Sequence, residues 1–105
     1  LFGQIADSIE QHIAEIQKEI ASMNPRLREL CEVRNAAEDA GGEAAVEVYD
    51  EIAEIENKQD DLDWQAWDAG KIARTFRYLQ VSGVTADQPA KIVEAFIDGH
   101  AGGEE

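Results

Sequence analysis

Residues 9–20 read IEQHIAEIQKEI and place isoleucine at positions 9, 13, 16 and 20. Steps of four and three residues put apolar side chains on one face of an α-helix, whereas a strand would alternate apolar and polar positions. The same spacing continues to Leu27 and Leu30. The sequence therefore predicts a long amphipathic helix over about residues 1–40, with the apolar stripe that is typical of coiled coils.

Pro25 falls within this stripe, where a proline removes a backbone hydrogen bond and disturbs the helix. The helix is either kinked at this point, or it ends and a new helix starts with Asn24 as its N-cap. The apolar stripe keeps its phase across Pro25, which favours one kinked, continuous helix.

Gly41 and Gly42 form the glycine pair between two long periodic segments, and they predict a helix end and a tight turn. A second long helix is expected over about residues 43–80, with Gln59 as a polar insertion in its apolar stripe. The two long helices and the turn between them form a helical hairpin over residues 1–80. Residues 81–105 are expected to form a turn, a short helix at 88–98 capped by Thr85 or Asp87, and an acidic tail.

Charge placement predicts that the two long helices pair antiparallel. Residues 43–68 carry ten acids against Lys58, and the basic residues Lys71, Arg74 and Arg77 follow them. The first helix has the same order, with acids at 7–19 and arginines at 26–34. Folding at the glycine pair brings each basic cluster beside an acidic stretch of the other helix.

The length of the helices predicts a second copy of the chain. A helix of about 38 residues is about 57 Å long, whereas a compact domain of about 100 residues has a radius of gyration near 13 Å. The hairpin leaves part of its apolar face open, and a homodimeric four-helix bundle is the simplest cover. The expected oligomer core consists of Ile9, Ile13, Ile16, Ile20, Leu27, Leu30, Ile52, Ile55, Leu62 and Phe76.

The chain is strongly acidic, with 23 Asp and Glu against 9 Lys and Arg and a net charge of −14 over 105 residues. This charge argues against direct binding of nucleic acid or anionic lipid, because phosphates would be repelled. It favours a protein partner with a basic surface. A single cysteine excludes a disulfide scaffold, and no membrane span or signal peptide is recognisable. We therefore expect a cytoplasmic protein of a bacterial or phage-infected cell.

Two surfaces of the second helix are candidate partner sites. The first is an acidic face, which either only solvates the helix or imitates a row of phosphates. The second is an aromatic and cationic strip, which is either a partner site or is covered by Ile92, Val93, Phe96 and Ile97 of the short helix. The acidic face is Glu47, Asp50, Glu54, Asp61 and Asp68, and the strip is Trp64, Trp67, Lys71, Arg74 and Tyr78.

One spacing of acids resembles a known family. Glu29-x-x-Glu32, followed after fourteen residues by Glu47-x-x-Asp50, resembles the paired acidic motif of the MazG-like all-α nucleoside triphosphate pyrophosphohydrolases. The resemblance implies that these four carboxylates hold magnesium ions against the phosphates of a substrate. The phase of the apolar stripes, however, places all four on outward positions of their helices.

The sequence contains no nucleophile motif and no phosphate-binding glycine loop. We therefore expect a non-enzymatic, all-α binding module without metal or cofactor. Its most concrete form is an inhibitor that imitates nucleic acid, of the kind phages encode. The alternatives are a structural adaptor or assembly chaperone that uses the apolar and tryptophan faces, and the magnesium-dependent pyrophosphohydrolase.

Overall fold

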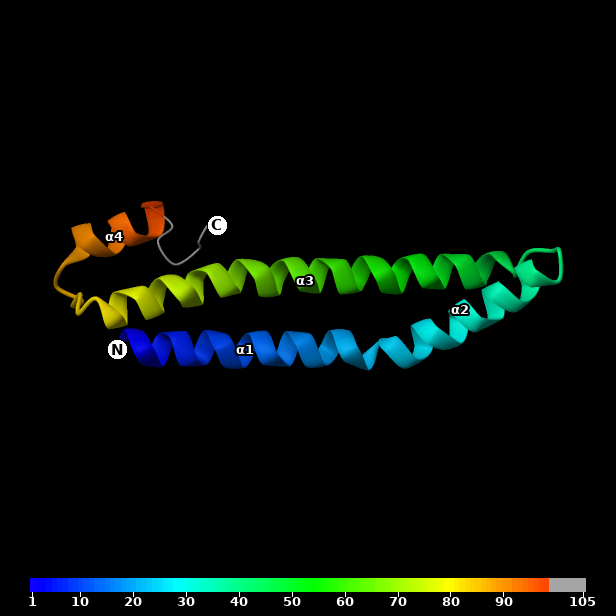
Figure 1. The fold of residues 1–105 in the computed structure, drawn as a ribbon, viewed down its shortest axis with the longest axis horizontal. Helices are drawn as coiled ribbons and strands as arrows, with labels where there is room; N and C mark the ends of the chain where they lie inside the picture. Colours follow the sequence, from blue (N-terminus) through cyan, green and yellow to red (C-terminus); the bar gives the residue numbers. More distant parts are fainter. Residues whose placement is uncertain (99–105) are drawn as a thin grey trace. The chain divides into compact units, whose positions relative to one another are not determined.

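A computed structural model describes residues 1–98, and over this range the chain is all-α and has no strand. The helices in chain order are α1 (Phe2–Ser22), α2 (Asn24–Asp39), α3 (Val46–Val81) and α4 (Pro89–Asp98), as Figure 1 shows. The all-α prediction, with long helices followed by a short one, is confirmed. The predicted acidic tail lies outside the described residues.

The chain forms two compact units, and α1 and α3 contribute residues to both. Unit 1 combines Leu1–Glu15 with the chain from residue 65 onward, and unit 2 is Ile16–Trp64. In unit 1, α3 runs antiparallel to α1. In unit 2, the first part of α3 runs antiparallel to the end of α1 and to α2 (Figure 1).

α1 and α2 meet at Met23, where the sequence favoured a single kinked helix. The structure has two helices instead, and Figure 1 shows the chain changing direction between them. The backbone of Met23 stays right-handed helical, and its N–H donates to the Ile20 carbonyl at 3.1 Å. Because Pro25 has no N–H to donate, the regular hydrogen-bond pattern fails here. Met23 rather than Asn24 is the N-cap of α2.

Gln59 of α3 bonds to this junction within unit 2. Its side-chain amide donates to the Ile20 carbonyl at 3.1 Å and to the Asn24 side-chain oxygen at 2.8 Å. The polar insertion in the apolar stripe therefore satisfies backbone and side-chain acceptors where α1 gives way to α2. Such a polar residue fixes the register of paired helices, because shifting it would leave polar groups unsatisfied.

α2 ends in a Schellman motif at the glycine pair. Gly41 has a φ of +89°, an angle that glycine adopts without the steric cost of a Cβ atom. Its N–H donates to the Glu38 carbonyl at 3.0 Å, and the Gly42 N–H donates to the Ala37 carbonyl at 3.1 Å. The predicted turn is confirmed, and α3 starts at Val46 rather than near residue 43.

α3 ends in the same way at Gly83, which has a φ of +73°. The next N–H, that of Val84, donates to the Leu79 carbonyl at 3.2 Å, and the Val84 side chain packs against the cluster around Leu79. Thr85 and Asp87, the predicted caps, bond to each other in a turn ahead of α4. The helix itself begins at Pro89, where the fixed φ of proline suits the first helical position.

A small apolar core holds α1, α3 and α4 together in unit 1. Phe2, Leu79 and Ala95 are buried there, one from each helix. Phe76 lies between two aromatic rings, with its centroid 5.8 Å from that of Phe2 and 5.3 Å from that of Phe96. Burying a large apolar side chain stabilises a fold by about 1.5–3 kcal/mol, so this core fixes α4 on the helix pair.

Ion pairs join the antiparallel helices within each unit, as the charge placement predicted. In unit 1, Arg77 of α3 pairs with Asp7 of α1 and, at 2.7 Å, with Glu10. In unit 2, Arg26 of α2 pairs with Glu51 of α3 at 2.8 Å. All these groups touch water, so each pair adds little stability. Both sets of pairs join a basic residue of one helix to an acidic stretch of the other, and together they still favour the antiparallel arrangement.

Candidate functional site

The five carboxylates of the predicted acidic face all lie on α3 and are all exposed. Asp68 belongs to unit 1 and the other four to unit 2. Within residues 1–98, no ion pair joins any of the five to a cation. Their charge is therefore available to a partner rather than used to hold the fold.

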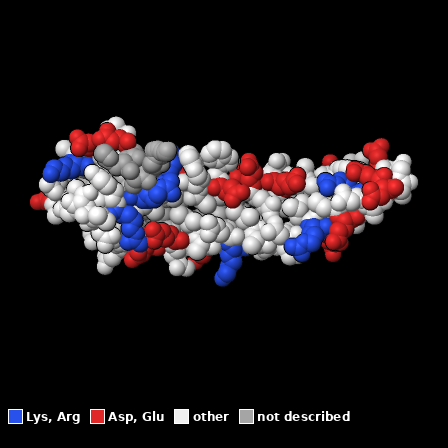
Figure 2. All heavy atoms as spheres, in the orientation of Figure 1, with Lys and Arg blue, Asp and Glu red and all other residues white. Residues whose placement is uncertain are grey.

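The density of charge on α3 is highest in unit 2. Residues 46–64 carry eight carboxylates against Lys58, a net charge of −7, and Figure 2 shows acidic side chains along this part of the helix. Nineteen helical residues span about 28 Å, which gives one net negative charge about every 4 Å. One strand of DNA carries one charge per about 3.4 Å of its axis. The two densities are close.

Glu51 is the one carboxylate of residues 46–64 for which the described chain supplies a cation. The Arg26 guanidinium donates to its two oxygens at 2.8 and 3.0 Å, the bidentate geometry that suits arginine. This pairing lowers the pKa of Glu51 and raises the pKa of Arg26, to which Glu29 also contributes as an acceptor. The charge of Arg26 is therefore already compensated within unit 2.

An open groove of about 520 Å³ lies beside the acidic face in unit 2. Apolar side chains of Met23 and Ile55 line it together with the carboxylates of Glu54 and Asp61. Its remaining lining residues are Arg26, Asn57 and Lys58. The lining therefore combines an apolar wall with two carboxylates and two cations, of which Arg26 is already paired with Glu51 and Glu29.

The sequence did not predict this groove. Ile55 belongs to the predicted oligomer core, and Met23 lies three residues after Ile20 and four before Leu27 on the apolar face of the first helix, so the spacing predicts packing here rather than an opening. Pro25 was the one sequence feature that could have indicated the groove, because a proline near the apolar stripe disturbs the adjacent helical turn and changes how the two helices meet. The size of the opening depends on the angle between α1 and α2, which spacing alone does not fix.

The aromatic and cationic strip is largely exposed. In unit 2, Trp64 is 57% exposed, and in unit 1 Trp67 and Tyr78 are 52% and 38% exposed. The Lys71 ammonium lies 4.5 Å from the centroid of the Trp67 ring, a cation–π contact. Arg74 is exposed on the same helix.

The short helix does not bury this strip. The sequence left open whether its apolar residues cover the tryptophans. In unit 1, Ile92 packs against the core cluster, whereas Val93, Phe96 and Ile97 remain exposed. The exposed tryptophans therefore stay candidates for a partner site.

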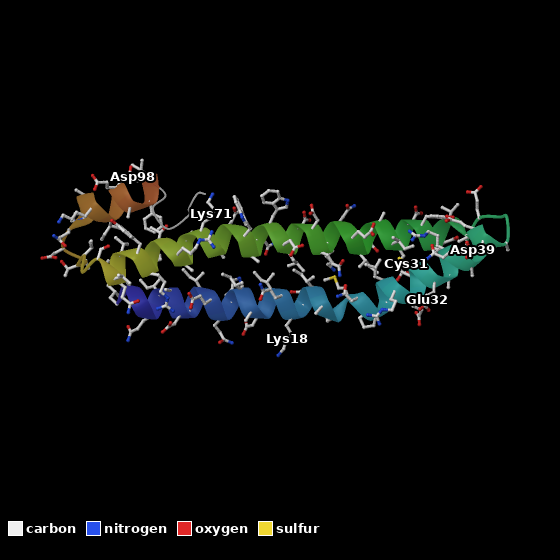
Figure 3. All side chains as sticks on the ribbon, in the orientation of Figure 1. Lys18, Cys31, Glu32, Asp39, Lys71 and Asp98 are labelled. Carbon is white, nitrogen blue, oxygen red and sulfur yellow. The ribbon has the colours of Figure 1, made fainter. Side chains whose placement is uncertain are left out.

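The four carboxylates of the MazG-like motif do not come together. Among residues 1–98, no three His, Cys, Asp or Glu side chains are grouped closely enough to hold a metal ion. Glu29 accepts a hydrogen bond from Arg26. Figure 3 shows Glu32 pointing away from α3, the helix that carries Glu47 and Asp50. These positions give no support to the ligand roles that the resemblance implies.

The residues of the predicted oligomer core are all buried or half-buried. Ile16, Leu30 and Ile52 are buried, at 4–5% exposure. The other members are half-buried: Ile9, Ile13, Ile20, Leu27, Ile55, Leu62 and Phe76. Pairing within the chain thus covers the stripe in part.

Two further findings concern the chain as a whole. Within residues 1–98, no helix combines the length and the apolar character that crossing a bilayer requires. Comparison of the sequence and structure with protein-family models, curated proteins and solved structures gave no match.

Proposed function

We propose that this chain is a non-enzymatic binding module whose acidic α3 face docks on the basic surface of a nucleic-acid-binding protein. The observation that carries the proposal is the charge density of residues 46–64, which is close to that of one DNA strand. A rigid helix holds these charges in place, so a basic surface made for phosphates meets a comparable field. The chain acts as a decoy that competes with nucleic acid.

The groove beside the acidic face supports the same proposal. It offers Glu54 and Asp61 next to the apolar side chains of Met23 and Ile55, with Lys58 and the already paired Arg26 also in its lining. Nucleic-acid-binding surfaces are rich in lysine and arginine, and one such side chain fits this combination. A partner lysine or arginine seated here would give the docking a fixed position along the helix.

An inhibitor of this kind acts inside the cell that contains its target. We therefore place the protein in the cytoplasm of a bacterial or phage-infected cell, where it occupies a host or phage nucleic-acid-binding machine.

The proposed active form is a homodimer. Seven of the ten residues of the predicted oligomer core are half-buried rather than buried, which leaves apolar surface along the helix pair for a second copy. A four-helix bundle along the helix pair is one arrangement of such a dimer, and contact through the apolar surface of α4 is another.

A structural adaptor is the alternative function, and the exposed tryptophans favour it. Trp64 and Trp67 are each more than half exposed, and tryptophan often dominates the binding energy of protein interfaces. In that case the acidic face only keeps the protein soluble.

The test is displacement of proteins from DNA. A bacterial lysate is passed over immobilised duplex DNA, and the bound proteins are then challenged with this chain at low salt. A decoy elutes its target, and the same challenge at high salt releases nothing beyond the salt control because charge attraction is screened. If this chain instead binds a protein of the lysate equally well at low and high salt, and added DNA does not compete, the result favours the adaptor.

A further inference from the structure

Helix α4 is apolar on two sides, and unit 1 covers only one of them. On the inner side, Ile92 and Ala95 pack into the core with Leu79. On the outer side, Val93, Phe96 and Ile97 are 55%, 39% and 78% exposed, and their spacing of three and four residues puts them together. Because Lys91, Glu94 and Asp98 make the rest of α4 polar, these exposed side chains form an apolar patch of the kind that marks an interaction site.

Ile72 extends this outer surface onto α3. Phe96 contacts Phe76 edge to face, and Ile72 lies one helical turn before Phe76 and is 43% exposed. We use the name α4 face for Ile72, Val93, Phe96 and Ile97, all of which belong to unit 1.

We infer that the α4 face is the contact between two copies of this chain. The inference rests on the homodimer proposed above and assigns its contact to unit 1 rather than to the helix pair of unit 2.

The distribution of charge favours a second copy at this place. Unit 2 carries 14 acids against 5 basic residues, a net charge of −9, whereas residues 1–15 and 65–98 of unit 1 carry 7 against 4, a net charge of −3. Two copies that met through unit 2 would bring its excess negative charge together. Contact through unit 1 meets much less repulsion.

The exposed area is sufficient for a weak dimer. Large apolar side chains have accessible areas of about 150–200 Å², so four that are roughly half exposed offer about 400 Å² per copy. A standard interface buries about 800 Å² per partner, of which about 65% is apolar in homodimers. The α4 face supplies most of the apolar part of that requirement.

The test is the oligomeric state of matched variants of the full chain, measured by sedimentation velocity over a range of concentrations. Val93→Lys with Ile97→Lys should weaken dimerisation at least tenfold and leave the helical circular dichroism unchanged, because both side chains are exposed. The control is Val33→Lys with Val46→Lys, which adds the same charge at exposed apolar positions of unit 2. That variant should dimerise like the parent.

The possible results separate the two proposals. A parent that stays monomeric at all concentrations overturns the homodimer and the α4 face together. A dimer that survives the α4 substitutions but is lost in the unit 2 variant overturns the α4 face alone and favours the four-helix bundle. As a second readout, Ile97→Cys in a Cys31→Ser chain should be trapped as a covalent dimer by a short thiol cross-linker, and Val33→Cys should not.

Discussion

Leu79 is the largest fully buried side chain of the described residues, and it lies where α1, α3 and α4 meet. We predict that Leu79→Ala lowers the free energy of unfolding by about 2–5 kcal/mol, because it removes apolar contacts and leaves a cavity. Val81→Ala is the control, since Val81 is 85% exposed two residues away, and it should change stability by less than about 0.5 kcal/mol. Chemical denaturation measures both. Equal losses for the two variants would contradict the core described for unit 1.

The Arg26–Glu51 pair predicts a pH dependence. Because Arg26 lowers the pKa of Glu51 in the folded chain, the pair stabilises the fold above the ordinary glutamate pKa of 4.5. This contribution is lost as the pH falls through that value toward the folded pKa. Arg26→Gln should therefore melt below the parent at neutral pH, and the difference should shrink as the pH is lowered to about 3.

Arg28→Gln is the matched control for the pair, because it removes the same charge at an exposed position of α2. Thermal melts of the parent and both variants across the pH range make the comparison. A difference between parent and Arg26→Gln that stays constant down to acidic pH would show that the carboxylates are not its cause.

Some contacts of single residues could be predicted from the sequence and others could not. Both helices carry acids first and basic residues later, and this shared order was enough to predict that the basic clusters with Arg26 and Arg77 pair with acids of the other helix. Such a prediction tolerates an error of several residues in the register, because attraction between charges does not require exact alignment. The partners of Gln59 were not predictable. Its hydrogen bonds to Ile20 and Asn24 depend on where the backbone opens near Pro25, which is a property of the folded junction.

The two glycines of the turn after α2 predict opposite responses to the same substitution. Gly41 has a φ of +89°, whereas Gly42 has neither a positive φ nor a neighbour close enough to clash with a Cβ atom. Gly41→Ala should lower the free energy of unfolding by about 1–2 kcal/mol. Gly42→Ala should be neutral or slightly stabilising, because alanine restricts the unfolded chain. Similar losses at both positions in a denaturation experiment would contradict the Schellman motif.

The helices themselves were predictable because their apolar spacing is long and regular. The short helix was predicted from its capping and turn residues, with a start at residue 88 where the structure has Pro89. The preference for one kinked helix across Met23 was wrong, because the apolar stripe keeps its phase whether a helix bends or restarts. Likewise, spacing showed that α4 is apolar, but it did not show that Ile92 faces inward while Ile97 faces outward. That choice is made by packing against Leu79.

At the scale of the whole molecule, apolar surface and charge are distributed unequally. The exposed residues of the α4 face belong to unit 1, while the segment of highest negative charge belongs to unit 2. This separation gives the chain one surface suited to a second copy and another suited to a basic partner. Net charge alone predicted the class of partner, but not this division.

The account predicts no hydrolysis of nucleotides. The protein incubated with magnesium and the common nucleoside triphosphates should release no pyrophosphate above a buffer control, because the motif carboxylates are not grouped as metal ligands within residues 1–98. Pyrophosphate release that disappears in a Glu47→Gln and Asp50→Asn variant would establish the MazG-like activity instead.

The measurement that tests the central claim most directly is partner affinity after neutralising the acidic face. Glu47→Gln, Asp50→Asn, Glu54→Gln and Asp61→Asn together remove four negative charges from α3 in unit 2, at exposed positions that the fold does not use. The matched control removes four exposed charges elsewhere, by Glu15→Gln, Glu19→Gln, Glu32→Gln and Asp39→Asn. Affinity for the protein displaced from DNA is then measured for both variants at one salt concentration. The account predicts at least a tenfold loss for the α3 variant and a much smaller loss for the control. Full affinity of the α3 variant, with loss in a Trp64→Ala and Trp67→Ala chain, would contradict it.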